Sequence, residues 1–286
     1  MSKRYLVESS WLEAHLHDED IRILDCMVFI HAKRGFSVES GYDNWVRGHI
    51  PGSRSADLLI DLSDPSSQLP FMIPKEDHFS NVMSGYGIDD HKSVVLYDAG
   101  KNMWAARVWW MLRSYGFENA AILNGGWQKW RLEGRPVSTD NVNYPAATFT
   151  AYPRTELIVD KEEVLAAVHD ENCCIINALT HLEHEGKLAF YGRPGHIPNS
   201  VNVPARSLVD KKTHAFLPIS ELRIIFAKCC ALAKKRVITY CGGGAAASSV
   251  AFALTLLGAT NVAVYDGSLI EWAQDSKLPM VTGINI

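Results

Sequence analysis

The 286-residue sequence has no long apolar run and little net charge. No stretch approaches the ~18 apolar residues that a membrane-spanning helix requires. The first 30 residues interrupt every short apolar stretch with acidic or basic side chains, so no signal-peptide core is evident. We therefore expect a cytoplasmic protein without a membrane partner. A formal charge of −4, with lysines and arginines scattered along the chain, also argues against nucleic acid as a partner.

Cysteine is scarce, and its spacing fits neither disulfides nor metal sites. The chain has six cysteines, and neither Cys-x-x-Cys nor His-Glu-x-x-His occurs. We therefore expect no metal and no organic cofactor, and a reducing compartment. Five of the six fit ordinary packing in apolar strands or a helix, namely Cys26, Cys173, Cys174, Cys229 and Cys230.

Cys241 lies in a different setting. A β-branched run over 237–240 ends on this cysteine, Gly-Gly-Gly follows, and an alanine-rich helical pattern begins at once. Such a strand-to-helix turn aims backbone amides and a helix N-terminus at the sulfur, which favours a reactive thiolate. Cys241 is therefore the predicted nucleophile. The amides predicted to hold its negative charge belong to Gly242, Gly243, Gly244, Ala245 and Ala246.

The absence of cations after Cys241 excludes one alternative chemistry. Cysteine phosphatases of the Cys-x5-Arg type need an arginine six positions after the cysteine to clamp phosphate. That position is Ala247 here, and no Lys or Arg occurs over 242–257. Phosphoryl transfer is therefore a poor candidate.

The sequence repeats itself in the same order in both halves. Gly48–Ser53 recurs as Gly195–Ser200, and the strand 94–98 recurs as 237–241. Near each end, Leu123–Gly126 with Trp130 matches Tyr265–Ser268 with Trp272. The repeat predicts two homologous domains, 1–138 and 156–286, joined by a linker over 139–155 that contains Pro145 and Pro153.

The fold class follows from the alternation of elements within each half. Short β-branched runs alternate with helical patterns, which indicates an α/β fold with a mainly parallel sheet flanked by helices. The helices are expected over Trp104–Tyr115, Glu221–Lys235 and Ala245–Leu257. Asp98 occupies in the first half the place that Cys241 holds in the second.

These motifs resemble the tandem-domain rhodaneses, the thiosulfate and 3-mercaptopyruvate sulfurtransferases. The resemblance rests on Gly195–Pro198, the Cys241 loop and Tyr265–Trp272 in the second half, with Arg107–Met111 and Leu123–Trp127 in the first. It implies two rhodanese-like domains, with Cys241 carrying a sulfane sulfur from a small donor to an acceptor such as cyanide, thioredoxin or a low-molecular-weight thiol. It also implies that the first domain is catalytically silent, which agrees with Asp98, since a carboxylate cannot carry a persulfide. The alternative is a sulfur carrier or regulatory binding module that a partner protein loads.

The loop sequence after the cysteine, which would govern the choice of sulfur donor, departs from the patterns of similar sequences. Thiosulfate-preferring members have a loop resembling Cys-Arg-Lys-Gly and mercaptopyruvate-preferring members Cys-Gly-Ser-Gly, whereas this chain has Cys-Gly-Gly-Gly. Without loop cations we expect poor use of thiosulfate. Arg193, beside the repeated Gly-His-Ile-Pro element, is the predicted carboxylate-binding residue. His49 and His196 are interpreted as structural residues that close turns.

Overall fold

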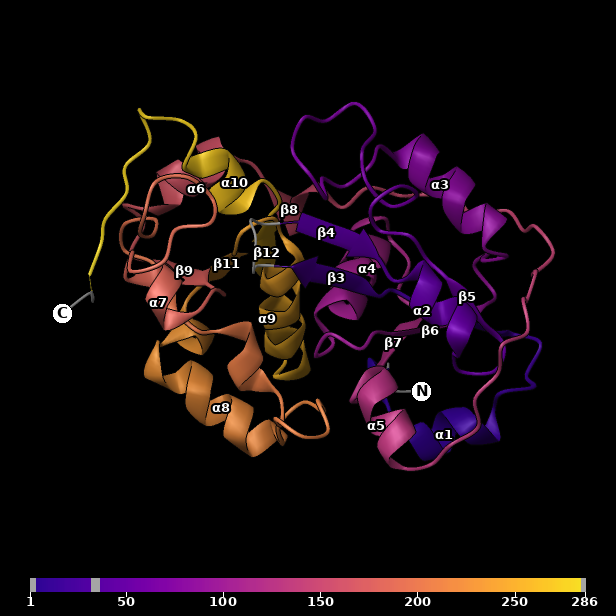
Figure 1. The fold of residues 1–286 in the computed structure, drawn as a ribbon. Coiled ribbons are helices and arrows are strands. Elements are labelled where there is room, and N and C mark those ends of the chain that lie inside the picture. Colours follow the sequence, from indigo (N-terminus) through magenta and orange to yellow (C-terminus); the bar gives the residue numbers. More distant parts are fainter. Residues whose placement is uncertain (1–3, 32–36, 284–286) are drawn as a thin grey trace. The chain divides into compact units, whose positions relative to one another are not determined.

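The computed structural model describes residues 4–31 and 37–283, and the chain divides into two compact units. The first unit comprises residues 1–66, 73–154 and 210–216, and the second comprises 67–72, 155–209 and 217–286. Each unit is built around its own parallel sheet with helices packed against it (Figure 1).

The sheet of the first unit has the order β1-β7-β6-β2-β5, and all its pairs are parallel. Its central strands are nearly continuous apolar runs because both faces are covered. A separate antiparallel hairpin follows β2. The strands are β1 (Leu6–Val7), β2 (Ile21–Asp25), β3 (Val28–His31), β4 (Ser37–Ser40), β5 (Ser53–Ser55), β6 (Ser93–Tyr97) and β7 (Ala120–Leu123).

The helices of the first unit connect and cover these strands. The most buried of them is α4, whose sequence is apolar on almost every side. Its Trp104, Trp109 and Trp110 are buried core residues. The five helices are α1 (Ser9–Ala14), α2 (Tyr42–Arg47), α3 (Glu76–Gly85), α4 (Met103–Ser114) and α5 (Gly126–Leu132).

The second unit repeats this topology. Its parallel sheet has the order β10-β9-β11-β12-β8, which is the order of the first sheet with each strand replaced by its repeat. The strands are β8 (Ile158–Val159), β9 (Cys173–Asn177), β10 (Val201–Asn202), β11 (Arg236–Tyr240) and β12 (Val262–Tyr265).

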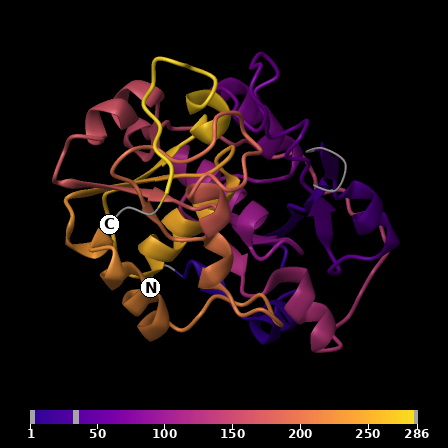
Figure 2. The same cartoon turned by 60° about the vertical axis from the view of Figure 1, so that its left-hand side comes forward.

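The helices of the second unit include α9, which is buried along almost its whole length and packs on β11 and β12. The two views of the fold agree that α8 lies beside α9 (Figures 1 and 2). Within the described residues, none of the helices combines the length and the apolar sequence that a membrane span demands. The helices are α6 (Lys161–Ala167), α7 (His181–His184), α8 (Ile219–Lys228), α9 (Ala245–Leu256) and α10 (Ser268–Trp272), with 3-10 turns η1 (Thr155–Leu157), η2 (Ala205–Leu208) and η3 (Ala231–Ala233).

Equivalent residues of the two units make the same hydrogen bonds, which confirms the internal repeat. In the first unit the Tyr97 hydroxyl is 2.8 Å from Ser53 Oγ, and in the second the Tyr240 hydroxyl is 2.8 Å from Ser200 Oγ. Trp127 N donates to Asp98 O, and at the equivalent place Leu269 N donates to Cys241 O. Asp98 and Cys241 therefore hold equivalent positions in equivalent loops.

Residues 139–155, predicted to be a linker, pack against the first unit in the structure up to Arg154. Phe149 is buried there, and its amide donates to Ser84 Oγ, while Tyr152 N and Arg154 N donate to carbonyl oxygens of α4 and its C-cap. The first unit thus extends to Arg154 rather than ending near residue 138.

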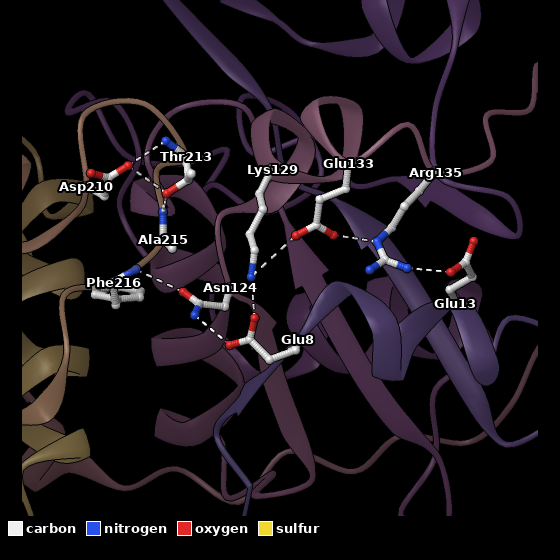
Figure 3. A network of polar contacts seen from close by, with 10 residues as sticks. All are labelled: Glu8, Glu13, Asn124, Lys129, Glu133, Arg135, Asp210, Thr213, Ala215 and Phe216. Atoms are coloured by element: carbon white, nitrogen blue, oxygen red, sulfur yellow. Dashed lines mark hydrogen bonds and ion pairs between the residues drawn. The ribbon is translucent and has the colours of Figure 1, made fainter.

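Each half of the sequence also contributes a short segment to the other unit. Residues 210–216 belong to the first unit, where Phe216 N donates to Asn124 Oδ1 over 2.9 Å and His214 O accepts from Asn102 Nδ2. Asn124 joins a polar network in which Glu8 and Glu133 pair with Lys129 (Figure 3). Residues 67–72 belong to the second unit.

One predicted helix is shorter than expected. The pattern over Glu221–Lys235 forms α8 only to Lys228, because Cys230 adopts a left-handed conformation with φ 55° and ends the helix. Cys229 and Cys230 therefore lie in a turn, not inside a helix.

Candidate active site

Cys241 follows β11 at the switch point of the second sheet. After β9 the chain forms β10 on one side of that strand and then crosses to β11 on the other. In parallel sheets this crossing leaves a crevice at the carboxyl ends of the two central strands. The Cys241 side chain is buried, with 3% of its surface exposed. The fold thus places the thiol where α/β proteins bind ligands.

Ser268 organises the loop around this thiol. Its Oγ accepts hydrogen bonds from Cys241 N at 3.1 Å and from Gly244 N at 3.2 Å, and it donates to Tyr265 O. Leu269 N and Ile270 N, at the start of α10, donate to the carbonyl oxygens of Cys241 and Gly242. The N-terminus of α10 therefore fixes the loop backbone.

Two of the five amides predicted to bind the sulfur already donate to acceptors within the protein. The amides of Gly244 and Ala245 are already committed, to Ser268 Oγ and to Gly243 O. Within the described residues, the amides of Gly242 and Gly243 donate to no protein acceptor. Ala246 is the second residue of α9, in the first turn, where amides lack an intrahelical partner. Of the five predicted amides, those of Gly242, Gly243 and Ala246 remain as candidates to bind an anion.

The equivalent loop of the first unit is filled by its own carboxylate. Asp98 Oδ1 accepts from the amides of Gly100 (2.6 Å) and Asn102 (3.0 Å), and Oδ2 from those of Trp104 (2.7 Å) and Ala105 (2.8 Å). Burial raises the pKa of Asp98, and the four N–H groups oppose that rise. The loop that follows β6 therefore holds a carboxylate at the N-terminus of α4.

Aromatic side chains flank the two glycines after Cys241. A Cβ added to Gly242 would lie 2.6 Å from Tyr191 Oη and closer still to two ring carbons. A Cβ added to Gly243 would make only ordinary contacts, 3.6 Å from Phe71 Cδ2 and 3.9 Å from Pro70 O. Neither glycine has a left-handed φ, so space and not backbone conformation requires glycine at 242.

Arg193 does not take the predicted place in the site. Its Nε donates to Ala273 O, its Nη1 to Leu278 O, and its Nη2 to Trp272 O and Asp275 O, over 2.6–3.1 Å. Four of the five guanidinium donors are thus used by backbone carbonyls at and after the end of α10. These contacts favour an anchoring role over the carboxylate-binding role that its sequence position suggested.

The two repeated histidines have the structural role predicted for them. His49 and His196 are fully buried, and each exchanges backbone hydrogen bonds with a distant segment, at Ser138 and Val281 respectively. His49 Nδ1 lies 2.7 Å from Trp45 O, and His196 Nδ1 lies 2.6 Å from His184 O. Both close the turn before β5 or β10.

Comparison with known proteins agrees with this geometry. The family model described as "Rhodanese-like domain" matches residues 8–133 and 160–275. The chain belongs to the rhodanese family. It is 34% identical to 3-mercaptopyruvate sulfurtransferase of Escherichia coli (98% of this chain, 99% of the relative) and 34% identical to putative thiosulfate sulfurtransferase 1 of Mycobacterium bovis (97% and 98%). It is also 30% identical to sulfur carrier protein TtuD of Thermus thermophilus (97% and 96%).

A solved rhodanese structure supports the fold over most of the chain. The crystal structure of the Escherichia coli 3-mercaptopyruvate enzyme superposes with a TM-score of 0.83, at 32% identity over 93% of this chain and 98% of that one. Because the sulfurtransferases that it resembles match over nearly their full length, this rhodanese is an enzyme of the sulfurtransferase type.

Sequence reasoning missed Ser268 and Tyr191 as parts of this rhodanese site. Ser268 could have been found, because the repeat aligns it with Gly126, and both adopt positive φ (49° and 50°) beside the equivalent loops. At Gly126 a side chain would collide with Asp98 O, whereas the second unit accommodates a serine there. Tyr191 has no counterpart in the repeat and no motif, so no sequence signal marked it.

Proposed function

We propose that the protein transfers a sulfane sulfur through a persulfide on Cys241. The thiolate attacks the outer sulfur of a small donor, a new S–S bond forms, and the donor's bond to that sulfur breaks. Pyruvate or sulfite leaves, depending on the donor. An acceptor thiol, or cyanide in an assay, then removes the outer sulfur and regenerates the thiolate.

The observation that carries this proposal is the carboxylate of Asp98 in the equivalent loop. Its two oxygens accept four amides around the N-terminus of α4. The second unit has Cys241 where the first has Asp98. With no carboxylate in this loop, its backbone amides can bind an anionic persulfide instead. Gly242, Gly243 and Ala246 are the donors that we assign to this role.

We propose 3-mercaptopyruvate rather than thiosulfate as the preferred donor. Thiosulfate is a dianion, and no Lys or Arg occurs over 242–257 to attract it. Cyanide, thioredoxin or a low-molecular-weight thiol in a cytoplasmic compartment would accept the sulfur. The relative named as a sulfur carrier favours a second candidate, in which a partner protein loads Cys241.

Steady-state turnover tests both candidates. We expect the purified protein to form pyruvate from 3-mercaptopyruvate with cyanide as acceptor, and Cys241→Ser to lose this activity completely. Cys26→Ser, which changes another buried cysteine, is the matched control and should retain it. Absence of turnover with either small donor, despite a persulfide on Cys241 after transfer from a loading protein, would instead support the carrier.

A further inference from the structure

Tyr191 occupies the space that a side chain at position 242 would need. The residue lies between α7 and β10, and its phenol end rests against the Cα of Gly242, next to Cys241. A side chain of any size at 242 would have to displace this ring. The side chains from Gly242 to Ala247 offer no hydroxyl and no cation, so Tyr191 brings to this loop a side-chain donor that its own residues lack.

The phenol is neutral, and the charges that face it are negative. Burial raises the pKa of Tyr191 first, and the negative charges of Cys241 and Glu183 raise it further. Glu183 is held in place by Thr180, whose amide and hydroxyl donate to Glu183 Oε2 over 3.0 and 2.6 Å. A protonated hydroxyl packed against Gly242, the residue after Cys241, is a hydrogen-bond donor that can also carry a proton.

We propose that Tyr191 relays the proton in sulfur transfer and thereby selects organic thiol donors, in which a carbon group leaves, over thiosulfate. The inference rests on the proposed persulfide chemistry of Cys241. It assigns to Tyr191 a catalytic role that the geometry of the Tyr191–Gly242 contact makes possible.

The step balances without any oxidant. The Cys241 thiolate attacks the thiol sulfur of R–CH2–SH, the new S–S bond forms, and the electron pair of the broken C–S bond goes to carbon. Tyr191 gives its proton to that carbon and regains one from the transferred sulfur, leaving R–CH3 and the Cys241–S–S⁻ anion. With thiosulfate, sulfite leaves as a stable anion and needs no proton, so the relay contributes nothing.

The first test is a donor-dependent loss in Tyr191→Phe. General acid catalysis typically contributes about 10²-fold or more. We expect kcat with 3-mercaptopyruvate to fall about 10²-fold, while turnover of thiosulfate changes less than about threefold and iodoacetamide alkylates Cys241 at the wild-type rate. The thermal midpoint should be unchanged, which separates a proton relay from a packing role.

The second test uses the contact with Gly242. Gly242→Ala should impair both donors at least tenfold because the new methyl group displaces the ring, whereas Gly243→Ala, which meets only ordinary contacts, should be nearly silent. In the double variant Tyr191→Ala with Gly242→Ala, thiosulfate turnover should recover and mercaptopyruvate turnover should not.

The two levels of the account fail separately. Equal losses for both donors in Tyr191→Phe, or no loss for either, would overturn the role of Tyr191 while a persulfide on Cys241 could still form. Sulfur transfer that persists in Cys241→Ser would instead overturn the proposed function itself.

Discussion

Arg193 illustrates how a side chain next to a predicted site can serve the fold. Its position beside Gly195–Pro198 pointed to the donor's carboxylate, but its guanidinium joins four backbone carbonyls near the end of α10. Such charge-assisted hydrogen bonds satisfy the last carbonyls of a helix, which have no intrahelical partner. The contacts account for the place of this partly buried arginine without invoking a substrate.

Arg193→Ala should therefore destabilise the protein more than it affects donor binding. Losing these bonds and leaving carbonyls unsatisfied should lower the free energy of unfolding by roughly 3 kcal/mol, measured by urea denaturation. Arg206→Ala, at an exposed arginine of the same unit, is the control and should change stability little. A tenfold rise in KM for 3-mercaptopyruvate at unchanged stability would contradict this account and restore the carboxylate-binding role.

His184 makes the second unit sensitive to mild acid. Burial lowers the pKa of His184 from 6.5 to about 4, and the neighbouring His196 adds to this effect. Between these values the unfolded chain binds the proton and the folded protein does not, so stability falls as pH drops from about 6.5 toward 4.

We expect His184→Gln to remove this part of the pH dependence. Between pH 7 and pH 5, the wild type should lose on the order of 1 kcal/mol more than the variant, since part of the effect is screened by solvent. Urea denaturation of both proteins at the two pH values measures the difference. Equal losses would show that His184 titrates normally in the fold.

At the scale of elements, the same strand-turn-helix unit appears once with a carboxylate and once with a thiol. The β6–α4 loop encloses the Asp98 carboxylate, and the β11–α9 loop presents Cys241. Gly-rich sequence and the β-branched run before it made this turn predictable. Tyr191 was not predictable, because it lies 50 residues away in sequence and meets the Cys241 loop only through the tertiary fold, whereas Ser268 at the start of α10 was marked by its alignment with Gly126 and was overlooked.

Asp98→Asn should destabilise the first unit because an amide has one acceptor oxygen where the carboxylate has two. Two of the four backbone donors would face an NH2 group, which should cost about 2 kcal/mol in the free energy of unfolding. Asp64→Asn is the control, since exposed Asp64 uses a single oxygen to cap its turn and the variant keeps one. Sulfur transfer per folded molecule should survive Asp98→Asn, and its loss would show that the first unit takes part in chemistry.

At the scale of the whole molecule, the duplication was readable because each motif recurs in the same order. The equal strand orders and the paired Ser–Tyr hydrogen bonds follow from that repeat. The exchanged segments 67–72 and 210–216 were not predictable, because irregular loops carry no hydrophobic period that would reveal where they pack. The predicted linker failed for a related reason: its prolines and polar residues suit an extended chain, and that chain lies on the first unit.

The central claim is that Cys241 carries the transferred sulfur. Intact mass spectrometry of the wild type and of Cys241→Ser, after incubation with 3-mercaptopyruvate or with thiosulfate, tests it most directly. We predict that the wild type gains one sulfur atom, more completely from 3-mercaptopyruvate, that cyanide removes it, and that Cys241→Ser gains none. A cyanide-labile sulfur on Cys241→Ser, or its location by peptide mapping on another cysteine of the wild type, would contradict the account.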